Sequence, residues 1–311
     1  MKAFVTGGAG FIGSNLVDAL LEKGYKVTVY DNLSLGTEDR VKYHFSNKNF
    51  IFIKADLLDF NKLLSSIKGH DIVFHLSANS DISNNNVTDI DLKQGTLVTY
   101  NVLEAMKLND IKKIVYSSTS AIYGEPRIMP TPEDYGPLQP ISLYGASKLA
   151  CEGLMTAFSH NFDFQIWMFR FANIIGKRGT HGVLVDFIKK LRNNQNELEI
   201  LGDGKQKKSY LEVRECVNGM LFSLENAKEA VNVFNLGCNS STQVDTIANI
   251  VVEEMGLKSV KFKYTGGKRG WKGDVPLMSL DVSKINKLGW KAKLSSNEAV
   301  RKAVQDLLAG Y

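Results

Sequence analysis

The 311-residue sequence predicts an α/β protein built on a doubly wound parallel sheet, with a smaller α/β lobe toward the C-terminus. In the first half, short apolar runs alternate with helical patterns, which is typical of such sheets. Runs such as Ile72-Val73-Phe74 are apolar on both faces, as strands covered by helices on both sides should be. A glycine-rich turn joins the first run to the first helical pattern.

The predicted elements follow one another in a regular order. Strands are expected at Ala3–Thr6, Lys26–Tyr30, Asn49–Lys54, Asp71–His75, Lys113–Ser117 and Gln165–Phe171. Helices are expected at Ser14–Lys23, Gln94–Lys107, Ser142–Phe158 and Val183–Asn193, and from Ser296 onward. The alternation loosens after residue 173, where glycine-rich turns occur at Gly202-Asp203-Gly204 and Thr265–Gly273. We therefore expect a first domain at residues 1–172 and a second at 173–311, with a soft boundary that leaves interleaving open.

Composition excludes several classes of protein. The net charge of +5, from 38 basic and 33 acidic residues, is spread along the chain. No basic stripe interleaved with aromatics is present, so a nucleic-acid partner is not expected. No signal-peptide pattern and no apolar run of membrane-spanning length occurs, which predicts a cytoplasmic protein without a membrane partner. Three cysteines with neither metal-site nor disulfide-framework spacing fit buried thiols in a reducing compartment: Cys151, Cys216 and Cys238.

The first candidate site is the glycine-rich turn Thr6-Gly7-Gly8-Ala9-Gly10-Phe11-Ile12-Gly13. Such a match is weak alone, but here it follows a strand and opens a helix. The glycines allow a tight turn and let a pyrophosphate approach backbone N–H groups at the helix N-terminus. The turn therefore predicts dinucleotide binding.

Acidic residues follow the second and third strands. Asp31 stands 18 residues after Gly13, where a carboxylate accepts hydrogen bonds from an adenosine ribose diol. A 2′-phosphate there would meet like charge, so Asp31 favours NAD over NADP. Asp56-Leu57, after the third strand, is a candidate to flank the adenine, although acidic residues are also common in loops.

The second candidate site is Tyr144-Gly145-Ala146-Ser147-Lys148, whose Tyr and Lys share one helix face. A Lys ammonium near a phenol lowers the pKa of the phenol and makes it an acid/base near neutral pH. A Tyr-x-x-x-Lys pair is common on helix surfaces. It indicates a catalytic site here because a glycine-rich turn that predicts dinucleotide binding precedes it in the chain. Hydroxyl groups in Ser117–Ser120 end the fifth strand, at the edge where such sheets bind ligands.

With these motifs the chain resembles the extended short-chain dehydrogenase/reductases and, within them, the nucleotide-sugar epimerases typified by UDP-glucose 4-epimerase. The resemblance covers essentially the whole chain. Besides the motifs above, it rests on His75–Ala78, Ala121-Ile122-Tyr123-Gly124, Arg170-Phe171-Ala172-Asn173, Gly202-Asp203-Gly204 and Gly270-Trp271-Lys272-Gly273-Asp274.

The resemblance implies a Rossmann-fold NAD site and a residue-by-residue assignment. Tyr144 matches the family's catalytic base, Lys148 the residue that binds the nicotinamide ribose and lowers the tyrosine pKa, and Thr119 a hydroxyl bridging tyrosine and sugar. The implied cofactor contacts are Gly7, Gly10, Phe11, Ile12, Gly13, Asp31, Asn32, Asp56, Leu57, Leu76, Ala78, Ser117, Tyr144 and Lys148.

The resemblance also implies a nucleotide-diphosphate sugar as substrate, bound by Thr119, Asn173, Lys208 and Arg269, and no metal. Lys208 stands where many members have Arg, so it supplies charge without the bidentate fork. The implied reaction is epimerisation at C4, with UDP-glucose and UDP-galactose as the first-choice pair. A homodimer that pairs the helices holding Asn101–Lys107 and Tyr144–Phe158 is also implied.

The sequence departs from the family at two places. Thr119 is followed by Ser120-Ala121 and not by the Asp-Glu pair of the dehydratases, which disfavours 4,6-dehydration. Gly95 replaces the Asn that most members carry, and the segment Asn79–Asn86 is rich in Asn and has Ser80 where some epimerases have Lys. A 4-dehydrogenase or 4-ketoreductase with net redox chemistry uses the same residues and remains the alternative, with a catalytically silent dinucleotide-binding protein as a third reading.

Overall fold

The computed structural model describes residues 1–79, 88–270 and 275–310. Most of the asparagine-rich segment, from Ser80 to Asn86, and the Trp271–Asp274 part of the last motif lie outside these residues. The chain forms two compact units. Unit 1 comprises Met1–Tyr123, Leu138–Arg170 and Met220–Phe234, and unit 2 comprises Gly124–Pro137, Phe171–Gly219 and Asn235–Tyr311. The units interleave along the chain, because residues 124–137 belong to the second and residues 220–234 to the first.

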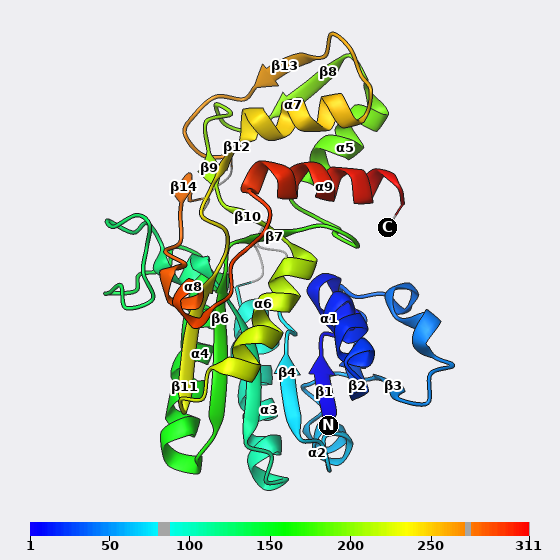
Figure 1. Ribbon diagram of the computed structural model, residues 1–311, viewed down its shortest axis with the longest axis vertical. Coiled ribbons are helices and arrows are strands. Elements are labelled where there is room, and N and C mark those ends of the chain that lie inside the picture. Colours follow the sequence, from blue (N-terminus) through cyan, green and yellow to red (C-terminus); the bar gives the residue numbers. More distant parts are fainter. Residues whose placement is uncertain (80–87, 271–274, 311) are drawn as a thin grey trace. The chain divides into compact units, whose positions relative to one another are not determined.

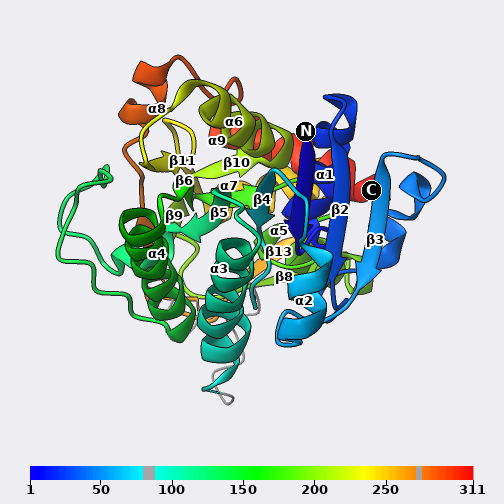
Figure 2. The same ribbon diagram turned by 90° about the horizontal axis from the view of Figure 1, so that it is seen from below.

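Unit 1 is organised by a seven-stranded sheet in the order β11-β6-β5-β4-β1-β2-β3 (Figures 1 and 2). Its strands are β1 (Lys2–Thr6), β2 (Lys26–Asp31), β3 (Phe50–Lys54), β4 (Ile72–His75), β5 (Lys113–Thr119), β6 (Gln165–Phe171) and β11 (Val231–Leu236). The pairs β1–β2, β1–β4, β2–β3 and β4–β5 are parallel, so these strands end at one edge of the sheet. The doubly wound α/β prediction is confirmed.

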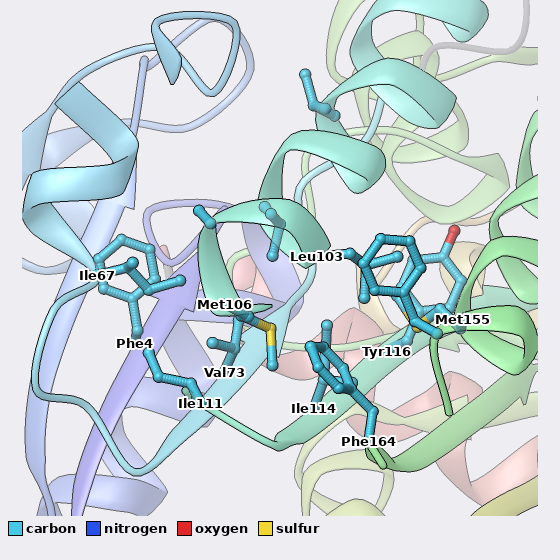
Figure 3. Close-up of a cluster of buried hydrophobic side chains, with 14 of the residues drawn as sticks. Phe4, Ile67, Val73, Leu103, Met106, Ile111, Ile114, Tyr116, Met155 and Phe164 are labelled. Atoms are coloured by element: carbon cyan, nitrogen blue, oxygen red, sulfur yellow. The ribbon is translucent and has the colours of Figure 1, made fainter. Parts of the chain in front are cut away.

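Helices cover both faces of this sheet. Figure 2 shows α2 (Phe60–Ser66), α3 (Val98–Leu108) and α4 (Leu143–Phe162) on one face and α1 (Phe11–Glu22) on the other. The first face forms a continuous core in which Leu103 and Met106 of α3 pack over Val73 and Ile114 of the sheet (Figure 3). Burying each such side chain contributes about 1.5–3 kcal/mol to folding, so this core holds the three helices on the sheet.

The expected strands of the first half occur within about two residues of their predicted limits. The helix expected at Gln94–Lys107 begins with a π-helical turn, Leu92–Leu97, and continues as α3. The strand β11 was not predicted, because it lies in the region assigned to the second lobe and joins the sheet only through contacts distant in sequence. Short 3₁₀ turns occupy Glu38–Arg40, Lys42–His44 and Ser120–Tyr123.

Unit 2 has its own core between the apolar faces of α5 (Val183–Asn193), α7 (Val244–Glu254) and α9 (Ser296–Leu308). Its strands form small sheets, in which β7 (Asn173–Ile175) pairs with β10 (Tyr210–Glu212) and β8 (Glu197–Ile200) with β13 (Lys261–Tyr264). The remaining elements are β9 (Lys207–Lys208), β12 (Thr242–Gln243), β14 (Leu277–Met278) and α8 (Ser283–Leu288). The helix α6 (Val213–Asn226) begins in unit 2 and ends in unit 1.

All three cysteines are buried free thiols, as the sequence predicts. Within the described part of the chain, no helix combines the length and the apolar character needed to cross a membrane.

A buried ion pair fixes α4 to the sheet. Arg170 on β6 and Glu152 on α4 are 6% and 5% exposed, and the guanidinium Nη2 lies 2.8 Å from Glu152 Oε2. The Ser118 hydroxyl also donates to Glu152, and Arg170 Nη1 donates to the Tyr123 hydroxyl at 2.9 Å. Since desolvated charges are stable only when paired and hydrogen-bonded, this network specifies where α4 lies on the sheet.

We expect Arg170→Met to cost about 3–5 kcal/mol of unfolding free energy, because Glu152 would remain buried without its counter-ion. Replacing both charges, with Glu152→Met added, should recover most of this loss. Urea unfolding of the two variants and the parent protein measures both effects. A single variant that lost less than about 1 kcal/mol would contradict the role of the pair.

Candidate active site

The glycine-rich turn between β1 and α1 has the geometry of a nucleotide-phosphate cradle. Gly7 adopts φ +69°, and a Cβ there would lie 2.8 Å from the Ser77 backbone N. A Cβ on Gly13 would lie 2.1 Å from the Gly7 carbonyl oxygen, so only glycine allows α1 to approach the turn this closely. Gly10 is the N-cap of α1, and among the described residues no side chain caps this end. The first N–H groups of α1 therefore remain available to an anion.

Asp31 is buried at the end of β2, beside this turn. Its two oxygens accept hydrogen bonds from the backbone N of Ala9 at 2.9 Å and of Leu33 at 2.8 Å. Burial raises the pKa of Asp31, and the two backbone bonds and the charge of Arg40 oppose that rise. Arg40, which the sequence analysis missed, donates from Nη1 to the Ala9 carbonyl at 3.1 Å. In the sequence Arg40 is a single basic residue in a predicted loop, and such residues are too common to indicate a binding site.

The predicted adenine-side residues come together after β2 and β3. Asn32 Nδ2 donates to Asp56 Oδ2 at 2.9 Å, and Leu57 is buried next to them. Leu76 and Ala78 follow β4 and are partly buried. Phe11 and Ile12 begin α1 and are also partly buried. Thus the predicted cofactor contacts lie at the carboxyl ends of adjacent parallel strands, the edge where doubly wound sheets bind ligands.

The three predicted catalytic residues lie together in unit 1. Ser142 caps α4 by accepting a hydrogen bond from Gly145 N at 3.1 Å, which starts the helix just before Tyr144. The Thr119 hydroxyl accepts a bond from Ala121 N at 3.2 Å and is hydrogen-bonded to the Tyr144 hydroxyl. Lys148 is 3% exposed, and its Nζ donates to the Ser117 carbonyl at 2.6 Å.

The electrostatics of this cluster differ from the sequence expectation. Burial raises the pKa of Tyr144 to about 12, and the hydrogen bond from Thr119 only partly offsets this. Burial also lowers the pKa of Lys148 to about 8. The Lys148 ammonium lies 5.9 Å from the Tyr144 ring centre and is directed to the Ser117 carbonyl. Burial is therefore the largest influence on the pKa of Tyr144 in this structure.

Three residues predicted to bind the substrate diphosphate belong to unit 2. Asn173 begins β7, and its Nδ2 donates to the Ser209 carbonyl at 3.4 Å, next to Lys208 in β9. The structure therefore brings Asn173 and Lys208 to neighbouring segments. Arg269 instead pairs with Glu125 at 2.6 Å, and its carbonyl lies beside Gly202. A phosphate at Arg269 would have to compete with the Glu125 carboxylate.

A phosphate-cradling turn, an acidic residue after β2 and a Tyr–Lys pair beside a Thr hydroxyl together define a dinucleotide-dependent enzyme of the short-chain dehydrogenase/reductase class. The model of the NAD dependent epimerase/dehydratase family matches residues 3–237, and the chain belongs to this family.

Similar proteins match nearly the whole length of the chain. A solved UDP-galactose 4-epimerase is 38% identical, with a TM-score of 0.89 over 99% of both chains. UDP-arabinose 4-epimerase 1 of Arabidopsis thaliana is 32% identical over 93% of this chain and 75% of its own. A UDP-glucuronic acid 4-epimerase variant of Bacillus cereus, solved with a fluorinated substrate analogue and NAD, is 27% identical with a TM-score of 0.90 over 100% of both chains.

The cofactor of this enzyme is NAD, and the residues of unit 1 fit it. The uncapped start of α1 and the close packing of Gly13 on Gly7 leave room for a pyrophosphate against the backbone. The Asp31 carboxylate keeps further acceptor capacity for ribose hydroxyls, since each oxygen accepts only one bond from the described residues.

We expect Gly13→Ala to weaken NAD binding about tenfold or more, because the added methyl group would displace the Gly7 carbonyl. Titration of NAD by calorimetry measures the affinity. Gly153→Ala is the matched control: it is also a helical glycine, but a Cβ there meets no atom within 4 Å. This control should keep NAD affinity and gain about 0.5–1 kcal/mol of stability. Equal affinities in the two variants would contradict the cradle.

Proposed function

We propose that this protein is a nucleotide-sugar 4-epimerase, with UDP-glucose and UDP-galactose as its substrate pair. The observation that carries the proposal is the cluster of Thr119, Tyr144 and Lys148 at the carboxyl edge of an NAD-binding sheet. The similarity to the solved UDP-galactose 4-epimerase supports the choice of sugar. In this proposal unit 1 binds NAD and unit 2 binds the nucleotide-diphosphate sugar.

Tyr144 is the acid/base of the proposed reaction. Its phenolate removes the proton from the sugar 4-hydroxyl. After the 4-keto sugar has turned, the phenol returns that proton to the C4 oxygen as the hydride re-enters C4 from the opposite face. The hydrogen bond from Thr119 favours the phenolate, because it stabilises the charged form of Tyr144. When bound, NAD would supply a reversible hydride acceptor for C4 and the positive charge of its oxidised ring.

In the proposed mechanism Lys148 binds the cofactor. Its ammonium donates to the Ser117 carbonyl, and in this proposal its remaining N–H groups would hydrogen-bond the nicotinamide ribose. Its pKa of about 8 keeps most of it protonated at neutral pH. Because the reaction has no net redox change, one tightly held NAD serves every turnover.

The residues after Thr119 argue against 4,6-dehydration. That reaction needs an acid/base pair to eliminate water, and here Ser120 and Ala121 follow Thr119 in a 3₁₀ turn that begins at Ser120. Neither side chain has a carboxylate that could exchange protons near neutral pH.

In unit 2 we assign Asn173, Lys208 and Arg269 to the diphosphate of the substrate. Lys208 supplies a positive charge on β9, and Asn173 lies on the neighbouring segment through its bond to Ser209. Because both epimers must bind the same pocket, we propose that the diphosphate stays bound while the sugar ring rotates to present its opposite face.

We also infer a homodimer that pairs α3 and α4 of two copies. Large apolar side chains are exposed on these helices, which supports burial against a second copy. They are Tyr100, Leu108, Leu143 and Phe162.

Purified protein given UDP-galactose without added NAD should form UDP-glucose, because the cofactor is retained. Proton NMR follows the anomeric signals of both sugars. We expect Tyr144→Phe to lower the rate by about 10²-fold or more, since the proton acceptor is lost. An unchanged rate in this variant would remove Tyr144 from its proposed role.

The alternative 4-dehydrogenase or 4-ketoreductase would consume soluble NAD or NADH in proportion to product. Following NADH absorbance in the same reactions separates the two activities. Net cofactor turnover without epimer formation would replace the proposed function with this one.

We expect Thr119→Val to move the rising limb of the kcat–pH profile to higher pH. Loss of the hydrogen bond removes an influence that lowers the pKa of Tyr144, so more alkaline conditions are needed to form the phenolate. A bond to a charged group contributes about 1.5–3 kcal/mol, which corresponds to about one pH unit or more. Thr119→Ser keeps the hydroxyl and should retain the parent profile. Identical profiles for Val and Ser would contradict this assignment.

A further inference from the structure

A π-helical turn precedes α3 and contacts the beginning of α4. It spans Leu92–Leu97, and its Gly95 is buried against α4. Such turns are rare and occur often at functional sites. The Gly95 carbonyl accepts a hydrogen bond from the Thr99 hydroxyl at 2.7 Å, and Thr99 in turn lies 3.0 Å from Nε2 of the buried His75. The turn is thus anchored to the centre of the sheet.

The tautomer of His75 follows from these bonds. The single hydroxyl proton of Thr99 goes to Gly95, so His75 Nε2 must donate to Thr99. Its Nδ1 then accepts from the Thr6 hydroxyl at 2.6 Å. Burial lowers the pKa of His75 to about 3, so the imidazole stays neutral and the chain of bonds stays intact across the working pH range.

Ser147 of α4 occupies the space above Gly95. A Cβ on Gly95 would lie 2.2 Å from Ser147 Oγ but 3.4 Å from Ser147 Cβ, which is ordinary contact. The buried Ser147 hydroxyl donates to the Asp91 carbonyl at 2.7 Å and lies 3.0 Å from the Thr96 hydroxyl. Rotation of Ser147 away from Gly95 would break both bonds. The hydrogen-bonded position of the Ser147 hydroxyl is therefore possible only because residue 95 has no side chain.

Ser147 lies in the helical turn that carries both Tyr144 and Lys148. Ser147 donates to the backbone carbonyl of Asp91, and the side-chain carboxylate of Asp91 accepts a hydrogen bond from Asn79 Nδ2 at 3.2 Å. Burial dominates the pKa values of Tyr144 and Lys148, and the negative charge of Asp91 acts on both and raises each. The other titratable groups facing this pair are His75 on β4, Tyr116 on β5, and Cys151 and Glu152 on α4.

We propose that Ser147 is a positioning residue: seated over Gly95, it holds the π-helical turn and its Asp91 against the beginning of α4, which carries Tyr144 and Lys148. The proposal rests on the proposed function, in which Tyr144 is the acid/base. Ser147 acts through Asp91 and the position of α4, without touching the sugar or NAD.

Melting temperatures of the holoenzyme test the pairing of Gly95 with Ser147. Gly95→Ala should melt about 5 °C lower, because the new methyl group overlaps Ser147 Oγ. Gly95→Ala combined with Ser147→Ala should melt no lower than Ser147→Ala alone, since the overlap is then gone. Additive losses would overturn the pairing. This measurement needs no substrate, so it decides the packing even if the proposed function fails.

The kcat–pH profile tests the positioning. Ser147→Ala should lower the plateau value of kcat about fivefold with KM for the sugar nucleotide unchanged, and should move the rising limb to lower pH. The sign follows because a less well-held Asp91 raises the pKa of Tyr144 less. Asp91→Asn should move the profile in the same direction, and Ser147→Ala should add no further shift to it.

Ser159→Ala is the matched control. Ser159 is also a buried serine of α4 and donates to a backbone carbonyl, that of Phe164, at 2.8 Å. It should lose stability and keep the parent profile. If Ser147→Ala also kept the parent profile while Asp91→Asn moved it, Ser147 would be a structural residue only. An inactive parent enzyme would instead reject the proposed function.

Discussion

The position of α4 against the sheet is the constraint on which the site depends. Three kinds of contact determine it: the buried Glu152–Arg170 ion pair, the bond from Lys148 to the Ser117 carbonyl, and the seat of Ser147 over Gly95. Each becomes costly if α4 moves, because a charge or a hydroxyl would be left buried without a partner. Rigid support of this kind is what an acid/base pair needs to react from one geometry.

Local sequence patterns were sufficient for the first half of the fold and for the cofactor cradle. A strand, a glycine-rich turn and a helix are adjacent in sequence, so Gly7 and Gly13 could be assigned without tertiary information. The Tyr144–Lys148 pair was predictable for the same reason, since helical spacing places both on one face. The role of Thr119 beside this pair came from the resemblance to a family and stays a prediction.

What the sequence could not provide depends on contacts between distant segments. The strand β11 joins the sheet beside β6, which lies about 60 residues earlier, so its pattern alone gave no reason to place it there. The high pKa of Tyr144 reflects burial, which spacing does not report. Gly95 was recognised as a departure from the family, but its partner Ser147 is 52 residues away and became visible only through packing.

The interleaving of the two units has a consequence for synthesis. The chain passes between them after residues 123, 137, 170, 219 and 234. The ribosome synthesises the chain from its N-terminus. The seven-stranded NAD-binding sheet is therefore complete only after β11 has been made, when about three quarters of the chain has been synthesised. Until then one edge of β6 has no partner strand, and its free backbone groups can pair with another chain. Nascent chains that stop before residue 231 are therefore the ones that most need a chaperone.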